Sequence, residues 1–266
     1  MITSLANPAV KRIRGLARRR EREAAGLFFV EGIRLVAQAA DLGAPIVEVV
    51  LAPDLLHSEF ARGVADRLAA GGVPVLEVSG KVFAGLSAKE GPQGIGAVVR
   101  QQWMRLEDIS LAGSLCWIAL DAVADPGNLG TILRTSDAVG AGGVILLGHT
   151  TDPYDPTAVR ASMGAIFAQR LVRSDAADLA RWAKGQGATI VGTSDRATDD
   201  YRTVTYPEKL ILLMGSERQG LTEGMPANLM VRIPMVGVSD SLNLAVATGV
   251  VLYEIFSRRH PPHIPS

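Results

Sequence analysis

The sequence predicts an α/β protein made of two successive domains, and three observations support this class. Short apolar runs alternate with segments of helical spacing along most of the chain. The chain has 266 residues, whereas one domain usually has about 100–150. Its composition is 48% hydrophobic and 20% charged, as in globular proteins with a substantial core. We therefore expect two cores, each formed by strands and helices.

The first hundred residues alternate between expected helices and expected strands. A basic segment from Pro8 to Ala25 has Ala and Leu at helical spacing, which predicts one helix. Strands separated by helices predict a small α/β domain over residues 1–100. Further helices are expected at 33–43 and 58–72, and strands at 27–31, 46–52, 74–78 and 94–99.

A second alternation follows a more polar stretch. The apolar rhythm weakens over residues 101–113, which we expect to be a linker to a domain at 114–266. Nearly continuous apolar strands predict a parallel sheet covered on both faces, with ligands bound beyond the carboxyl ends of the strands. The expected strands are 115–120, 143–147, 188–192, 209–215 and 231–235, and the expected helices are 129–139, 156–168, 175–186 and 242–258.

Charge is distributed unevenly although the formal net charge is zero. Residues 1–26 contain a cluster of cations against only two acidic residues. Such a cluster predicts contact with RNA phosphates, and the alternative is an ordinary solvated helix face. The cations are Lys11, Arg12, Arg14, Arg18, Arg19, Arg20 and Arg22.

Several protein classes are excluded by the sequence. Cys116 is the only cysteine and lies in an apolar run, so we expect an inert core thiol and a reducing, cytoplasmic location. Four scattered histidines do not form a zinc set, so no metal is expected. The longest apolar stretch contains Asn243 and Glu254 and falls short of the ~20 residues of a membrane span, so no membrane partner is expected. Rossmann, P-loop and hydrolase-elbow motifs are missing from the sequence.

Three loops after expected strands carry the candidate site. In the first, Asn128 is expected to cap a helix that contains Gly130 and Arg134, and Arg134 suits either a structural salt bridge or a ligand. In the second loop, Gly215 and Glu217 form either a ligand-binding turn or a plain strand-to-helix turn.

The third loop leads into the last helix. Ser241 is expected at the start of this apolar helix, with Asn243 in its first turn. A serine cap with a satisfied asparagine is the structural alternative to a ligand site.

Taken together, the loops resemble a known family. They resemble the three motifs of the SpoU (TrmH) branch of the SPOUT RNA methyltransferases, over roughly residues 114–258. The N-terminal hundred residues are similar to the ribosomal-protein-like substrate-binding domain of ribosomal RNA members, at residues 7–20 and 28–36. The motif residues are Asn128, Gly130 and Arg134, then Gly215, Glu217 and Gly220, then Ile233, Pro234 and Met235 with Ser241 to Ala245.

This resemblance implies a fold, a cofactor and a reaction. It implies a C-terminal trefoil knot, a homodimer, and transfer of a methyl group from S-adenosyl-L-methionine to a ribose 2'-hydroxyl of RNA. Knots are too rare to be expected from periodicity. The cofactor contacts fall on Gly215, Ile233 and Leu242, mainly through backbone groups, and Thr193 and Met235 are expected in the same pocket.

The resemblance assigns Arg134 as the catalytic base, but a guanidinium stays protonated in proteins. We expect Arg134 instead to bind the RNA phosphate and the hydroxyl oxygen, with the proton passing to phosphate or water. Ser241 and Asn243 are expected to fix the ribose, Asn128 to orient Arg134, and Glu217 to hold the second loop.

The RNA target is less constrained than the chemistry. Arg160 resembles a family position near the RNA, and the N-terminal domain favours large-subunit ribosomal RNA as substrate. Transfer RNA, a resistance methylase and a non-catalytic RNA-binding or assembly factor remain as alternatives. The presence of Arg134, Ser241 and Asn243 argues against the non-catalytic alternative.

Overall fold

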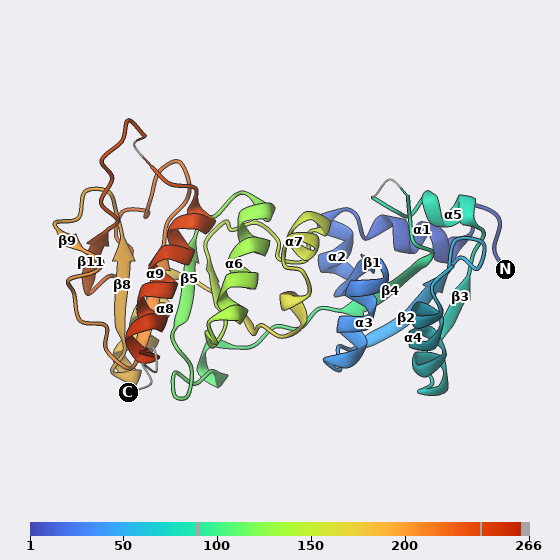
Figure 1. The fold of residues 1–266 in the computed structure, drawn as a ribbon, viewed down its shortest axis with the longest axis horizontal. Coiled ribbons are helices and arrows are strands. Elements are labelled where there is room, and N and C mark those ends of the chain that lie inside the picture. The colour runs from blue at the N-terminus through green and yellow to red at the C-terminus, as the bar shows by residue number, and fades with distance from the viewer. Residues whose placement is uncertain (89–90, 240, 262–266) are drawn as a thin grey trace, which may run out of the picture. The chain divides into compact units, whose positions relative to one another are not determined.

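The computed structural model describes residues 1–88, 91–239 and 241–261, which form two compact units (Figure 1). Unit 1 comprises Met1–Gln101 together with Asp152–Ala168, and unit 2 comprises the rest. The segment 152–168 therefore groups with the N-terminal residues, although the strands on either side of it in the sequence belong to unit 2.

Unit 1 is built on a mixed four-stranded sheet with the order β1-β4-β2-β3. Strands β1 (Leu27–Glu31) and β2 (Ile46–Leu51) run antiparallel to β4 (Ile95–Arg100), and β3 (Val75–Glu77) runs parallel to β2. The expected α/β class and all four expected strands are confirmed. The helices are α1 (Pro8–Gly15), α2 (Arg19–Ala25), α3 (Ile33–Asp41), α4 (Glu59–Ala70), α5 (Gly80–Ala84), α7 (Pro156–Ala161) and the 3-10 turn η2 (Ala165–Phe167).

The single helix expected from Pro8 to Ala25 is wrong, because the chain breaks into α1 and α2. Leu16 ends α1 with its side chain buried in the core, and Arg18 adopts an extended backbone before α2. The break leaves the carbonyls of Leu16 and Ala17 without helical partners. Both accept hydrogen bonds from Nη1 of Arg22, at 3.0 and 2.8 Å. A buried arginine thus replaces the helical hydrogen bonds that the break removes.

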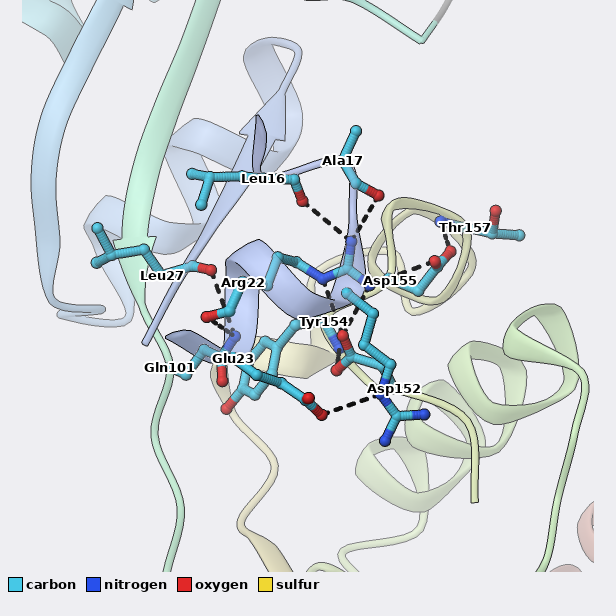
Figure 2. Close-up of polar contacts among 11 residues, drawn as sticks. Leu16, Ala17, Arg22, Glu23, Leu27, Gln101, Asp152, Tyr154, Asp155 and Thr157 are labelled. Atoms are coloured by element: carbon cyan, nitrogen blue, oxygen red, sulfur yellow. Dashed lines mark hydrogen bonds and ion pairs between the residues drawn. The ribbon is translucent and has the colours of Figure 1, made fainter. Parts of the chain in front are cut away.

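Arg22 also anchors the segment 152–168 to α2 (Figure 2). Its side chain is 1% exposed, and Nε donates to Oδ2 of Asp152 at 2.8 Å. Asp152 is equally buried, and its second oxygen accepts the backbone N–H of Tyr154. Asp155 lies 3.5 Å from the same guanidinium. Arg22 is therefore a structural residue and not one of the cations that face solvent.

Aromatic packing joins the same segment to the edge strand β1. The ring centroid of Phe28 lies 4.6 Å from that of Tyr154 and 6.3 Å from that of Phe167. The single helix expected over 156–168 is wrong, because Met163 and Gly164 have positive φ angles and separate α7 from η2.

Unit 2 contains a seven-stranded sheet in which every pairing is parallel, as expected. The sequence pattern misses β7 and β9 because the first is partly polar and the second has only two residues. The order is β7 (Leu171–Ser174), β6 (Val144–Leu147), β5 (Trp117–Asp121), β10 (Leu210–Met214), β8 (Thr189–Thr193), β11 (Leu229–Arg232) and β9 (Asp199–Asp200). The helices are α6 (Pro126–Ala138), α8 (Ala176–Gln186), α9 (Leu244–Arg259) and the 3-10 turn η1 (Leu106–Asp108).

The strand order positions the functional loops. The chain runs outward from β5 through β6 to β7, then returns to β8, and β10 inserts between β5 and β8. Because all strands are parallel, the loop after β10 leaves the sheet beside the loops after β5 and β8. Helix α9 packs against α6, which places the last helix of the described residues beside the first α-helix of the unit.

Two further features concern the core and membranes. Leu106, Ile109 and Leu111, within the stretch expected as a linker, pack into the core of unit 2. Burial raises the pKa of the Cys116 thiol to about 12, which agrees with an inert core thiol. Within the described ranges, we find no helix with the length and apolar character needed to cross a membrane.

Replacing Arg22 by Met should destabilise unit 1, because Asp152 would remain buried without its cationic partner. Breaking a buried ion pair costs about 3–5 kcal/mol. The free energy of unfolding from urea titration measures the loss. Arg19→Met is the matched control, since Arg19 is on the same helix and forms an exposed pair with Glu23, and it should change stability by less than about 1 kcal/mol. Equal effects of the two substitutions would contradict the anchoring role.

Candidate active site

A pocket of about 620 Å³ lies at the carboxyl ends of the parallel strands of unit 2. This size is within the range of about 300–1,000 Å³ that is usual for ligand pockets. The ends of β8, β10 and β11 and the start of α9 form its walls. The lining residues include Thr193, Ser194, Asp195, Arg196, Met214, Gly215, Ser216, Glu217, Arg218, Leu221, Ile233, Met235, Ser241, Leu242 and Leu244.

The loop after β10 is closed tightly against itself. Ser216 and Gly220 exchange backbone hydrogen bonds of 2.9 and 3.0 Å, and Gly220 has a φ of +66°. A Cβ atom at Gly215 would overlap the backbone of Gly220 and Leu221. Glycine at 215 is therefore required for the loop to fold back on itself, and the turn presents backbone groups to the pocket.

The five residues expected to bind the cofactor all line this pocket. Thr193 ends β8, Gly215 follows β10, and Ile233 and Met235 follow β11. Leu242 precedes α9 and leaves 40% of its surface exposed. Glu217 and Ser241, expected to have catalytic roles, line the same space.

A chain of side-chain hydrogen bonds connects the three motifs next to the pocket. Nδ2 of Asn128 donates to Oε1 of Glu217 at 2.9 Å. Nδ2 of Asn243 donates to Oδ1 of Asn128, also at 2.9 Å. Oδ1 of Asn243 accepts the backbone N–H groups of Ala245 and Val246 at the start of α9. Residues 128, 217 and 243 are thus joined although they are far apart in the sequence.

The expected cap of α6 is wrong, and the structure also differs from the serine cap that was the structural alternative at α9. Asp125, not Asn128, caps α6, and its Oδ1 accepts the backbone N–H of Asn128 at 2.8 Å. Asn243, not Ser241, caps α9, which begins at Leu244. In the first case Pro126 starts the helix three residues earlier than expected, since proline suits the first helical turn. The Asn128 side chain is consequently available for the other two motifs.

Arg134 lies on α6 with an exposed side chain and is not among the pocket-lining residues. In the described part of the chain it makes no ion pair, so the structural salt bridge is not observed. The hydrogen bonds of Asn128 go to Glu217 and Asn243 and not to Arg134. Arg134 is therefore available to an external ligand.

Sequence reasoning missed Asp121, the last residue of β5. Its carboxylate is 1% exposed, and Oδ2 accepts the backbone N–H of Thr222 at 2.7 Å. This bond ties the segment after the β10 loop to the neighbouring strand. The sequence does contain a signal for this contact, because Asp121 ends the apolar run WIALD. A carboxylate buried at the end of such a strand requires a hydrogen-bond donor.

The expected RNA-binding cations differ in their surroundings. Arg12, Arg18 and Arg19 form ion pairs with Glu48, Glu21 and Glu23 at 2.7, 3.4 and 2.9 Å. The remaining ones make no ion pair within the described residues: Lys11, Arg14, Arg20 and Arg160. These four are available for an external anion.

Comparisons with known proteins match both halves of the chain. Residues 116–253 match the model of the SpoU rRNA Methylase family, and residues 7–97 match the MRM3-like substrate binding domain. The 23S rRNA (uridine(2479)-2'-O)-methyltransferase of Streptomyces viridochromogenes is 31% identical and covers 92% of this chain and 87% of its own length. The 23S rRNA (guanosine(2553)-2'-O)-methyltransferase RlmP of Bacillus subtilis is 28% identical over 96% of this chain and 98% of its own.

A solved structure agrees with these matches. The crystal structure of an AdoMet-bound rRNA methyltransferase from Sinorhizobium meliloti superposes with a TM-score of 0.88, at 42% identity and over 98% of both chains. The family expected from the three motifs is therefore confirmed, and this chain belongs to the SpoU rRNA methylase family.

Proposed function

We propose that this protein transfers a methyl group from S-adenosyl-L-methionine to a ribose 2'-hydroxyl of large-subunit ribosomal RNA. The observation that carries the proposal is the hydrogen-bond chain from Glu217 through Asn128 to Asn243, which joins all three motifs beside one pocket. The relatives from Streptomyces and Bacillus, which act on ribose hydroxyls of 23S rRNA, support the substrate.

The pocket suits S-adenosyl-L-methionine in size and chemistry. The tight turn at Gly215 lines the pocket, and Leu221 and Leu242 supply apolar walls. Glu217 lines the pocket and adds a carboxylate to it. Thr193, Gly215, Ile233, Met235 and Leu242 are the residues that would hold the cofactor, which supplies a methyl group activated by the sulfonium charge.

The protein must also align the ribose 2'-hydroxyl with the methyl group and allow the proton of that hydroxyl to leave. Arg134 would bind an RNA phosphate and the 2'-oxygen, and its positive charge would stabilise the alkoxide that develops as the proton leaves to phosphate or water. Ser241 and Asn243 would hold the ribose. Asn128 would act by fixing Glu217 and Asn243, since its hydrogen bonds go to those two residues.

The N-terminal unit would supply binding to RNA. Lys11, Arg14, Arg20 and Arg160 would contact phosphates, while Arg12, Arg18 and Arg19 would have to exchange an existing carboxylate partner. Such contacts give affinity that falls with salt and carries little sequence information.

We also propose that the chain forms the C-terminal trefoil knot and the homodimer of the family. The insertion of β10 between β5 and β8, and the return of α9 to α6, support a threaded C-terminal region. Helix α9 carries Val246 and Tyr253 on one face, each 53% exposed and seven residues apart. An exposed apolar stripe of this kind is typical of an interface, and a second copy of the chain would cover it.

Replacing Gly215 by Ala should weaken binding of S-adenosyl-L-methionine. The added Cβ would push the turn out of the shape that lines the pocket. Overpacking costs about 1–3 kcal/mol, which corresponds to a Kd raised about 5- to 150-fold. Isothermal calorimetry with the purified protein measures this. Gly185→Ala is the control, because Gly185 lies exposed on α8 with nothing near its Cβ position. Unchanged affinity in the Gly215 variant would exclude this turn as the cofactor site.

Replacing Arg134 by Lys should lower the rate of methyl transfer about 100-fold, the usual effect of losing one oriented donor to a developing oxyanion. Affinity for S-adenosyl-L-methionine should stay unchanged, because Arg134 does not line the pocket. Transfer of labelled methyl to ribosomal RNA measures the rate. Arg181→Lys, on the exposed face of α8, is the control. A rate near that of the wild type would rule out the role of the planar guanidinium.

The double substitution Val246→Glu and Tyr253→Glu should convert a dimer to a monomer, because four charges would be buried in a two-fold interface. Sedimentation velocity at micromolar concentration measures the mass. Phe60→Glu, at a residue 64% exposed on α4, is the control and should leave the mass unchanged. A monomeric wild-type protein would refute the dimer but not the methyl transfer.

A further inference from the structure

A second, smaller pocket of about 210 Å³ lies within unit 1, among residues of α1, β1 and α7. Ile13, Phe29 and Leu35 give it apolar walls. Pockets for drug-sized ligands usually measure about 300–1,000 Å³. This one therefore has room for a single ring system and not for a complete cofactor.

Two arginines from distant parts of the sequence line this pocket. Arg14 comes from α1 and Arg160 from α7. Within the described residues, neither guanidinium forms an ion pair, whereas Arg12 and Arg19 pair with carboxylates and Arg22 is buried against Asp152. A guanidinium without a carboxylate partner at the rim of a pocket is suited to a phosphate, which it binds with two parallel hydrogen bonds.

A carboxylate completes the pocket. Glu31, at the end of β1, is 9% exposed, and its Oε1 accepts the backbone N–H of Ala88 at 3.1 Å. A carboxylate accepts about four hydrogen bonds, so one backbone donor does not exhaust it. The pocket thus combines apolar walls, an acceptor and two cations, which together fit a planar ring with an amino group, flanked by phosphates.

We propose that this pocket takes one unpaired nucleobase of the RNA substrate. Arg14 and Arg160 bind the phosphates on either side, and Glu31 accepts a hydrogen bond from the exocyclic amino group of the base. Adenine, cytosine and guanine carry such a group, whereas the exocyclic oxygens of uracil only accept. The inference rests on the proposed function in one respect, namely that RNA is the substrate.

Binding to RNA hairpins with one unpaired loop nucleotide tests the proposal. The probes share one stem and carry adenosine, cytidine, uridine or an abasic ribose at that position. Fluorescence anisotropy is measured on the full chain with saturating S-adenosyl-L-methionine, so that no base enters the larger pocket. The adenosine or cytidine probe should bind on the order of tenfold more tightly than the abasic one. Equal affinity for all four probes would overturn the proposal.

Filling the pocket without removing charge separates base binding from phosphate binding. Ala17 lines the pocket and is exposed, so Ala17→Leu should abolish the preference for base-bearing probes and leave the salt dependence unchanged. Ala24→Leu, at an exposed position on α2 outside the pocket, is the control and should keep the preference. A preference that survives Ala17→Leu would place the base elsewhere and refute the site.

Removing the two cations tests the phosphate contacts. The double variant Arg14→Gln and Arg160→Gln should reduce the slope of log affinity against log salt by about two. Arg67→Gln, at an exposed residue paired with Asp41, should leave the slope unchanged. A reduced slope without any base preference would mean that phosphates alone are bound, which overturns the base pocket. Loss of methyl transfer with an intact base preference would instead contradict only the proposed function.

Discussion

The candidate active site depends on the two hydrogen bonds of the Asn128 side chain. Its amide donates to Glu217 in the β10 loop and accepts from Asn243 at the start of α9, and so connects two segments that the sheet alone does not join. Each such bond contributes only about 0.5–1.5 kcal/mol. Because an amide has both a donor and an acceptor, Asn128 fixes both neighbours at once. Aspartate has no amide donor, and leucine has neither group.

The β10 loop, which carries Glu217, is closed by hydrogen bonds between Ser216 and Gly220. Gly215 allows the backbone to fold onto Gly220, and Asp121 holds Thr222 through a buried carboxylate. Glu217 therefore projects from a loop that is anchored on both sides. A binding site built on a loop that its own hydrogen bonds already hold in place loses less entropy when a ligand binds. Arg134, in contrast, lies outside this framework, which suits its proposed contact with an RNA phosphate.

Sequence patterns predicted the architecture well wherever one physical rule decided the outcome. The parallel sheet followed from uninterrupted apolar strands, and the pocket followed from glycine and polar residues at their carboxyl ends. The prediction of a helix start failed where two polar residues could each cap the helix, as with Asp125 and Asn128. Pro126, which lies between them, determined where α6 begins. Asp121 was missed because no spacing rule indicates which backbone N–H will meet a carboxylate. The hydrogen bonds of Asn128 were unpredictable for the same reason, since both partners are distant in sequence.

The basic N-terminal segment illustrates the limit of counting charges. Its arginines look equivalent in the sequence, but their surroundings in the structure differ even within α2, where Arg19 is exposed and Arg22 is buried. Arg22 turns inward, satisfies two carbonyls and pairs with Asp152, so its charge is neutralised inside unit 1. The same contact holds the segment that carries Arg160, which together with Arg14 lines the smaller pocket. A buried ion pair is weak evidence of stability, but it can specify geometry. In unit 1, the buried Arg22 thus helps to position Arg160 at the smaller pocket.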